Sequence, residues 1–326
     1  MRGWLWILVV VAALGAATAP RAAADDIRLH VITNDFVLPS KLDRLAEFGV
    51  PEGVAVGKTY VEGLSGDDKT WLDADLIILD TPRGNDRAQV MAAVGDALEG
   101  TQVPWLAIGG GRPLSGNIPR DIQGQLYAYY QAGGAENFRN LMRFVSAWKQ
   151  GADMAGIPAA GEMPPAGFYH PDAPRLFASL EDYLAWGQDR WKANAPRLAV
   201  AISDGYVSNM QTAVIDALVS RLEAAGGVPL IFWFDGKAED GLQRMIARAG
   251  ASTLVNMTHM TSGDARKAEF EALHMPVVMA FIGREGTADE WRAAAQGIPA
   301  RTASALMAAP ESWGMSVPVV LGAVES

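Results

Sequence analysis

The residues best suited to chemistry lie in one short loop, which reads His170-Pro171-Asp172-Ala173-Pro174. An imidazole and a carboxylate two residues apart could serve an active site, and the prolines around Asp172 fix the backbone and exclude a helix there. The loop leads to an expected helix containing Tyr183-Leu184-Ala185-Trp186, with Ser179 as its predicted N-cap. We therefore expect a rigid loop in which His170 either orients the backbone by a hydrogen bond or touches a ligand.

The other histidines and the lack of cysteine restrict metal chemistry. The chain has four histidines, and no two of them show the i, i+4 spacing of helical metal ligands. Without cysteine there is neither a thiolate site nor a disulfide framework, so no metal ligand is predicted. His259 follows an expected strand and is the best candidate at a ligand-binding rim, whereas His30 and His274 are interpreted as structural. No nucleophile with a base and an orienting acid stands out, and no catalytic residue is predicted.

Two series of alternating strands and helices must position these residues. Hydrophobic periodicity predicts the first series over 27–32, 39–48, 54–61, 76–79, 86–98 and 104–108, followed by helical residues 119–150 that are broken at Gly133-Gly134. It predicts the second over 198–202, 209–225, 229–234, 239–249, 253–257, 265–273 and 276–282, with a further helix holding Trp291. This order indicates an α/β protein with two open, mainly parallel sheets of the Rossmann or flavodoxin type.

Composition divides the chain into four parts. Residues 1–24 resemble a signal peptide, residues 25–150 form an N-terminal α/β domain, and residues 196–326 form a second α/β domain that we expect to be truncated at its C-terminus. Between the domains, residues 151–195 are a Pro- and Gly-rich connector that carries the loop and the Tyr183 helix.

Ligands of open α/β sheets bind outside the carboxyl ends of the strands. Asp204, Asp235 and His259 each follow an expected strand of the second domain. With His170 and Asp172 of the loop, they are the predicted ligand-binding residues.

Charge argues against a nucleic-acid partner. The chain has 27 basic and 37 acidic residues, a formal net charge of −10, and shows no basic patch of the kind a phosphate backbone needs. The run Gly109-Gly110-Gly111 lacks the spacing of both phosphate-binding glycine motifs, so nucleotide binding is not expected there.

The N-terminus predicts export. Arg2 precedes an apolar run from Leu5 to Ala17, and Ala22-Ala23-Ala24 offers a small-residue cleavage site. An uncleaved membrane anchor is the alternative, but the run is short for a spanning helix of about 20 residues. No later segment is long and apolar enough to span. We therefore expect a periplasmic protein that is not integral to the membrane.

Three groups of motifs resemble, in order, the large subunit of the cobaltochelatase and magnesium chelatase family (the CobN and H-subunit type). They are Tyr129-Tyr130-Gln131-Ala132-Gly133-Gly134-Ala135-Glu136-Asn137-Phe138, then Gly167-Phe168-Tyr169-His170-Pro171-Asp172-Ala173-Pro174, then Met275-Pro276-Val277-Val278 with Glu290-Trp291, Gly297-Ile298, Pro310-Glu311 and Gly314. The similarity covers roughly residues 27–326. One departure is Trp313, which stands where the family usually has an acidic residue.

The resemblance implies a function in metal insertion. The family's large subunit carries the tetrapyrrole or corrinoid that receives the metal, and AAA-type ATPase and adaptor subunits use ATP and Mg²⁺. The segment itself is therefore expected to bind no cofactor. Family members are several times longer, and their chelation residues lie beyond position 326, so we expect this segment alone to be catalytically incompetent. The competing hypothesis is an exported two-lobe binding protein for a tetrapyrrole or another small ligand, without catalysis.

Overall fold

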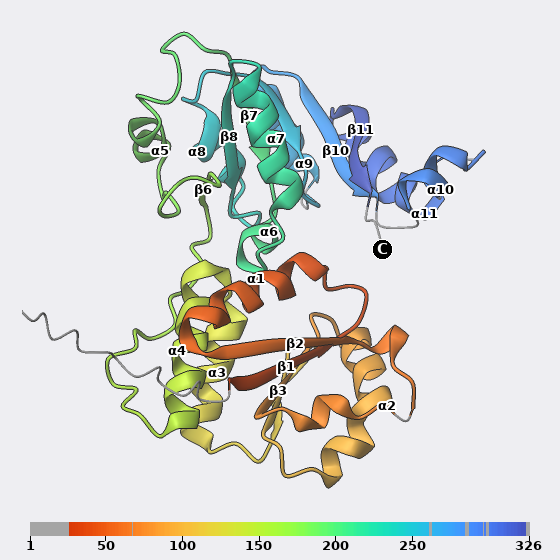
Figure 1. Ribbon diagram of the computed structural model, residues 1–326. Helices are drawn as coiled ribbons and strands as arrows, with labels where there is room; N and C mark the ends of the chain where they lie inside the picture. Colours follow the sequence, from red (N-terminus) through yellow and green to blue (C-terminus); the bar gives the residue numbers. More distant parts are fainter. Residues whose placement is uncertain are drawn as a thin grey trace, which may run out of the picture.

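The computed structural model describes residues 26–66, 68–260, 263–283, 287–295, 297 and 300–323. These residues form two α/β lobes, one above the other in Figure 1. The predicted signal peptide, residues 1–24, lies outside them. Within the described part of the chain, no helix combines the length and apolar character needed to cross a membrane.

The first lobe is a five-stranded sheet in the order β2-β1-β3-β4-β5, in which only β5 is antiparallel to its neighbour. Its strands are β1 (Ile27–Thr33), β2 (Val54–Tyr60), β3 (Leu76–Asp80), β4 (Trp105–Ile108) and β5 (Leu114–Gly116). Its helices are α1 (Pro39–Gly49), α2 (Gly84–Gly100), α3 (Arg120–Ala132) and α4 (Gly134–Gln150).

Helices cover both faces of this sheet, with α1, α3 and α4 on one face and α2 on the other (Figure 1). Strand β3 explains why both faces must be covered, since all five of its residues are buried. Leu76 and Ile78 pack into the core with α1, α3 and α4, while Ile77 and Leu79 pack against α2. The continuous apolar run of β3 therefore contributes side chains to the hydrophobic cores on both faces of the sheet.

The second lobe repeats this order. Its parallel strands are β7 (Arg197–Ala201), β8 (Val228–Trp233), β9 (Ala251–Asn256), β10 (Val277–Gly283) and β11 (Ser316–Ala323). They lie in the order β8-β7-β9-β10-β11, so both lobes follow the order 2-1-3-4-5 of flavodoxin-like sheets. The prediction of two mainly parallel, flavodoxin-type sheets is thus confirmed.

Helices again lie on both faces of the second sheet. Helix α7 (Ala213–Ala224) covers one face, and α5 (Leu180–Trp186), α8 (Gly241–Ile246) and α9 (Gly263–Leu273) cover the other. Among the described residues of this lobe, the other α-helices are the short segments α6 (Asp204–Ser208), α10 (Ala288–Ala293), α11 (Ala300–Ala303) and α12 (Ala309–Ser312). The helix predicted over 209–225 starts later than expected, because residues 209–212 form a turn in which Met210 has φ of 56°.

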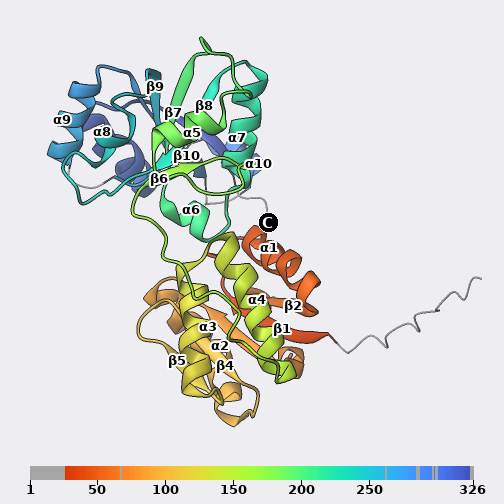
Figure 2. The same ribbon diagram turned by 90° about the vertical axis from the view of Figure 1, so that its left-hand side faces the viewer.

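The connector is fastened to both lobes. The Asn137 side chain donates to the carbonyls of Gly133 (2.7 Å) and Gly161 (2.8 Å) and accepts from the Gly161 amide (2.9 Å), which ties the connector to α4. Further along, β6 (Gly167–Tyr169) pairs antiparallel with β8 and becomes the edge strand of the second sheet. Figure 2 shows the connector running up one side of both lobes.

The two lobes touch where α3 ends. Gly133, between α3 and α4, has φ of 65°, and a Cβ built there would lie 2.2 Å from the carbonyl oxygen of Ser208 in the second lobe. The neighbouring Gly134 has φ of 80° but no atom within 4 Å of its Cβ position. A side chain at Gly133 would therefore push the lobes apart.

We predict that Gly133→Ala destabilises the protein more than Gly134→Ala does. Both changes place alanine at a positive φ, which costs about 1–3 kcal/mol, but only the first adds the clash with Ser208. Thermal unfolding followed by circular dichroism gives the comparison. Equal losses of stability in the two variants would show that this contact between the lobes is loose.

Candidate functional site

A cavity of about 670 Å³ lies between the lobes. It lies at the carboxyl ends of β3 and β4 in the first lobe and beside α6, which follows the carboxyl end of β7, in the second lobe. Open α/β sheets bind ligands at such strand ends. Its volume is in the range of small-molecule sites. It is lined by Lys41, Asp80, Pro82, Ile108, Gly109, Tyr127, Ala128, Tyr130, Gln131, Ala132, Gly133, Ala160, Gly161, Glu162, Met163, Asp204, Ser208 and Asn209.

The wall in the first lobe contains a buried ion pair. Lys41 of α1 is 3% exposed, and its Nζ lies 2.7 Å from Oδ2 of Asp80, the last residue of β3. The Tyr130 hydroxyl donates to the same Oδ2 at 2.9 Å, and its ring centroid lies 4.6 Å from Nζ. Burial, together with the Asp80 charge, raises the pKa of Tyr130 well above its ordinary value, so the phenol remains a donor.

The position of this pair follows from the topology. In the order 2-1-3-4-5, the connections after β1 and β3 leave on opposite faces, and the crevice opens between these two strands. Asp80 ends β3 at this point, and the Thr33 hydroxyl at the end of β1 donates to the Asp80 carbonyl at 2.7 Å. The corresponding strand end in the second lobe carries Asn256, an uncharged residue. At the switch point, the place where the strand order reverses, the first lobe thus has the charged pair of Lys41 and Asp80, and the second lobe has the amide of Asn256.

The wall in the second lobe comes from α6 and the turn after it. Ser203 caps α6 by accepting from the Gly205 amide. Asn209 donates through Nδ2 to the Gly205 carbonyl at 3.1 Å, which holds the other end of its amide in place. The Asn209 Oδ1 accepts from Nζ of Lys41 at 3.0 Å, a hydrogen bond that crosses from one lobe to the other.

The sequence-predicted residues are distributed over separate places. Asp204, the first residue of α6, lines the cavity, where its carboxylate is exposed. Asp235 is exposed after β8, and its side chain accepts from the Lys237 amide at 2.9 Å in a local turn. His259 is exposed after β9 and does not line the cavity. Ligand binding by Asp235 and His259 therefore remains a prediction.

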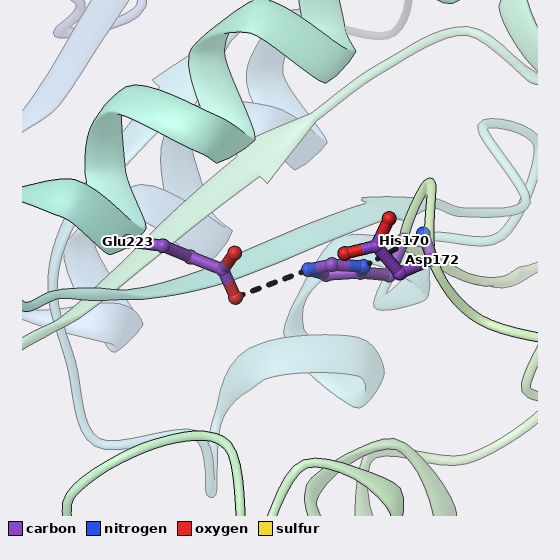
Figure 3. Close-up of side chains that lie close together, drawn as sticks. All are labelled: His170, Asp172 and Glu223. Carbon is purple, nitrogen blue, oxygen red and sulfur yellow. Dashed lines mark hydrogen bonds and ion pairs between the residues drawn. The ribbon is translucent and has the colours of Figure 1, made fainter.

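The structure brings His170 and Asp172 together with Glu223 of α7 (Figure 3). The Asp172 amide donates to His170 Nδ1 at 3.1 Å, so Nε2 carries the proton and donates to Glu223 Oε1 at 3.2 Å. Burial lowers the pKa of His170, which keeps the imidazole uncharged near neutral pH. The loop therefore shows the orienting hydrogen bond that was one of the two expected roles for His170.

Arg190 closes this cluster. Its guanidinium binds both carboxylate oxygens of Glu223, at 2.5 and 2.8 Å, and also contacts Asp172. These hydrogen bonds, with one from Trp191, lower the pKa of Glu223 to about 2. A ring nitrogen of His170 and one carboxylate oxygen each of Asp172 and Glu223 lie within 4.8 Å of one another. The guanidinium of Arg190 already forms ion pairs with both carboxylates and supplies the positive charge at this position.

The loop lies away from the cavity. Because β6 is antiparallel to β8, with Tyr169 opposite Ile231, the chain leaves β6 toward the amino end of β8. Glu223 lies near the same end, since α7 immediately precedes β8. The cavity is at the carboxyl ends of the strands. Ligand contact by His170 and Asp172 thus stays a prediction, whereas their mutual contacts fix the loop to the second lobe.

Two residues of the cavity, Lys41 and Asn209, were not singled out from the sequence, and Tyr130 was noted only within a family motif. Lys41 could have been noticed, because it lies four residues before Leu45 and eight before Gly49 on the buried stripe of α1. A lysine in such a stripe requires a buried partner. That partner, Asp80, ends the most apolar strand of the lobe.

We predict that Glu223→Gln lowers the free energy of unfolding at pH 7 by about 2 kcal/mol. The folded-state pKa of Glu223, about 2, is below its unfolded value of 4.5. Its ionised form therefore stabilises the protein fully above pH 4.5, and this contribution is lost as the pH falls toward 2. The deficit of the variant should shrink accordingly in urea unfolding between pH 7 and 3.5. Glu271→Gln, at an exposed position of α9, is the control. A deficit independent of pH would contradict the assignment.

Comparisons with known proteins agree with this architecture. A model of the CobN/magnesium chelatase family matches residues 127–326, more than half of the chain. The catalytic subunit of cobaltochelatase from Mycobacterium tuberculosis is similar in structure, with a TM-score of 0.59, 19% identity and 88% of this chain covered. The match covers 24% of that chain, so the present sequence spans about a quarter of its length. At this identity the likeness establishes the fold.

Two other solved structures are much less similar. The C-terminal domain of glucosamine-fructose-6-phosphate aminotransferase from Francisella tularensis has a TM-score of 0.26 at 8% identity, covering 91% of this chain and 78% of that chain. The D-lactate dehydrogenase of Escherichia coli has a TM-score of 0.24 at 9% identity, covering 90% and 81%. Both scores are too low to support an argument. No curated protein sequence gives a significant match. From the family model, the chain belongs to the CobN/magnesium chelatase family.

Proposed function

We propose that this chain is the N-terminal part of a chelatase large subunit and holds a tetrapyrrole or corrinoid between its two lobes. The observation that carries this proposal is the 670 Å³ cavity bounded by the ligand-binding edges of both sheets. The family supplies the ligand class, because its large subunit carries the macrocycle that receives the metal.

The lining of the cavity suits a flat ligand with a polar rim. Ile108, Tyr127, Ala128 and Met163 offer an apolar surface, on which a macrocycle would exclude water. The exposed carboxylate of Asp204 can accept hydrogen bonds from groups at the edge of such a ligand. In this proposal the chain binds and orients, and the metal ion is a substrate delivered elsewhere in the complete protein.

The chemistry of insertion is assigned to the complete complex. We propose that AAA-type ATPase and adaptor subunits drive insertion with ATP, as a ligase-type cobaltochelatase of cobalamin biosynthesis would. The predicted signal peptide adds a periplasmic location to the proposal. The alternative is an exported two-lobe protein that uses the same cleft for a tetrapyrrole or another small ligand, without taking part in insertion.

Calorimetric titration of the full chain with coproporphyrin III and with cobinamide tests the binding step. We expect saturable binding of at least one ligand, and Ala128→Phe should weaken it at least about tenfold by filling the cavity, a loss of about 1.4 kcal/mol. Ala92→Phe, at an exposed position of α2 away from the cavity, is the matched control and should bind normally. Binding that Ala128→Phe leaves unchanged would place the ligand outside the cleft.

An insertion assay separates the two candidate roles. Cobalt insertion by the remaining chelatase components should require the chain if it acts in the complex, and Ala128→Phe should reduce the rate. If the chain binds the macrocycle but adding it never changes insertion, the exported binding protein is the better description.

A further inference from the structure

We propose that the Lys41 ammonium changes its hydrogen-bond acceptor when the ligand binds. In the empty cleft it donates to Asn209 of the second lobe. In the filled cleft it donates instead to an uncharged oxygen of the ligand, of the carboxamide type. This inference rests on the proposed function for the nature of the ligand. The contact between the lobes on which it depends can be tested without any ligand.

Lys41 is fixed on the side of the first lobe. Its ammonium is almost fully buried, and it is held by Asp80 at 2.7 Å over the ring of Tyr130. A buried carboxylate and ammonium remain together because separating them leaves a charge without compensation. Any rearrangement at this point will therefore break the bond to the second lobe and leave the ion pair intact.

Asn209 is the replaceable partner. Its Oδ1, at 3.0 Å from Lys41, is an uncharged acceptor that belongs to the turn after α6. Both the main-chain amide and the side-chain Nδ2 of Asn209 donate to the Gly205 carbonyl, so the side-chain amide is held by the second lobe. A hydrogen bond to an ammonium that a ligand oxygen can reproduce is exchanged at little net cost.

The same turn places the second lobe on the first. Next to Asn209, Met210 packs against the hydrophobic core of the first lobe, and the Ser208 carbonyl faces Gly133. These contacts and the Lys41 bond lie within three consecutive residues. Loss of the Lys41 hydrogen bond to Asn209 would thus act directly on the turn through which the two lobes contact each other.

The charges around the cavity select an uncharged oxygen. Lys41 is balanced by Asp80, and Asp204 and Glu162 add two carboxylates to the lining. A ligand carboxylate would meet this excess of negative charge, whereas a carboxamide reproduces the group that Asn209 already presents. We therefore expect amidated side chains to bind better than acidic ones.

The first experiment measures the distance between the lobes. Since the chain has no cysteine, Ala93→Cys on α2 and Ser220→Cys on α7, both exposed, place one spin label on each lobe. In pulsed electron resonance of the ligand-free protein, Asn209→Ala should lengthen or broaden the distance distribution. Gln211→Ala, in the same turn but outside the cavity lining, should leave it unchanged. A distribution for Asn209→Ala identical to that of the parent protein would overturn the proposal.

The second experiment compares coproporphyrin III with its tetra-amide, which has the same macrocycle with uncharged carboxamides in place of the four carboxylates. The tetra-amide should bind at least about tenfold more tightly and shift the parent distribution toward that of Asn209→Ala. Equal affinities, or tighter binding of the acid, would overturn the assignment of an uncharged oxygen. If neither porphyrin binds while Asn209→Ala still changes the distance, the proposed tetrapyrrole function fails and the contact between the lobes stands.

Discussion

The buried ion pair of Lys41 and Asp80 is the interaction around which the cleft is organised. It lies where the strand order of the first sheet reverses, and it is almost inaccessible to water. Such a pair requires close geometry and additional hydrogen bonds to be tolerated. Tyr130 supplies one of these bonds from α3 and Asn209 supplies another from the second lobe. The charges therefore tie two helices, a strand and the opposite lobe to one point.

The two lobes share one strand order and differ in what they place at its switch point. Asp80 in the first lobe corresponds to Asn256 in the second, whose amide bonds to the backbone of Thr258. The second lobe instead uses its polar residues at the amino end of the sheet, where His170, Glu223 and Arg190 fix the connector loop. The loop motif from Gly167 to Pro174 thus fastens the connector, whereas the motif from Tyr129 to Phe138 contributes Tyr130 and Gly133 to the cleft.

The sequence was sufficient to predict the two sheets, because each buried strand is a short apolar run between helical segments. It was insufficient for the site. Asp80 and Lys41 are 39 positions apart and Lys41 and Asn209 are 168 apart, so only the folded chain brings them together. The turn at 209–212 was also missed, because the hydrophobic pattern of residues 209–225 is helical throughout, whereas Met210 adopts φ of 56°. Asp204 was found because strand ends are visible in the sequence.

Hydrogen exchange of the chain with and without a saturating tetrapyrrole, coproporphyrin III or cobinamide, tests the central claim that both lobes form one ligand site. The account predicts slower exchange in two separate segments, residues 127–133 at the end of α3 and residues 204–209 in and after α6. Protection confined to one lobe, or centred on the His170 loop, would contradict it.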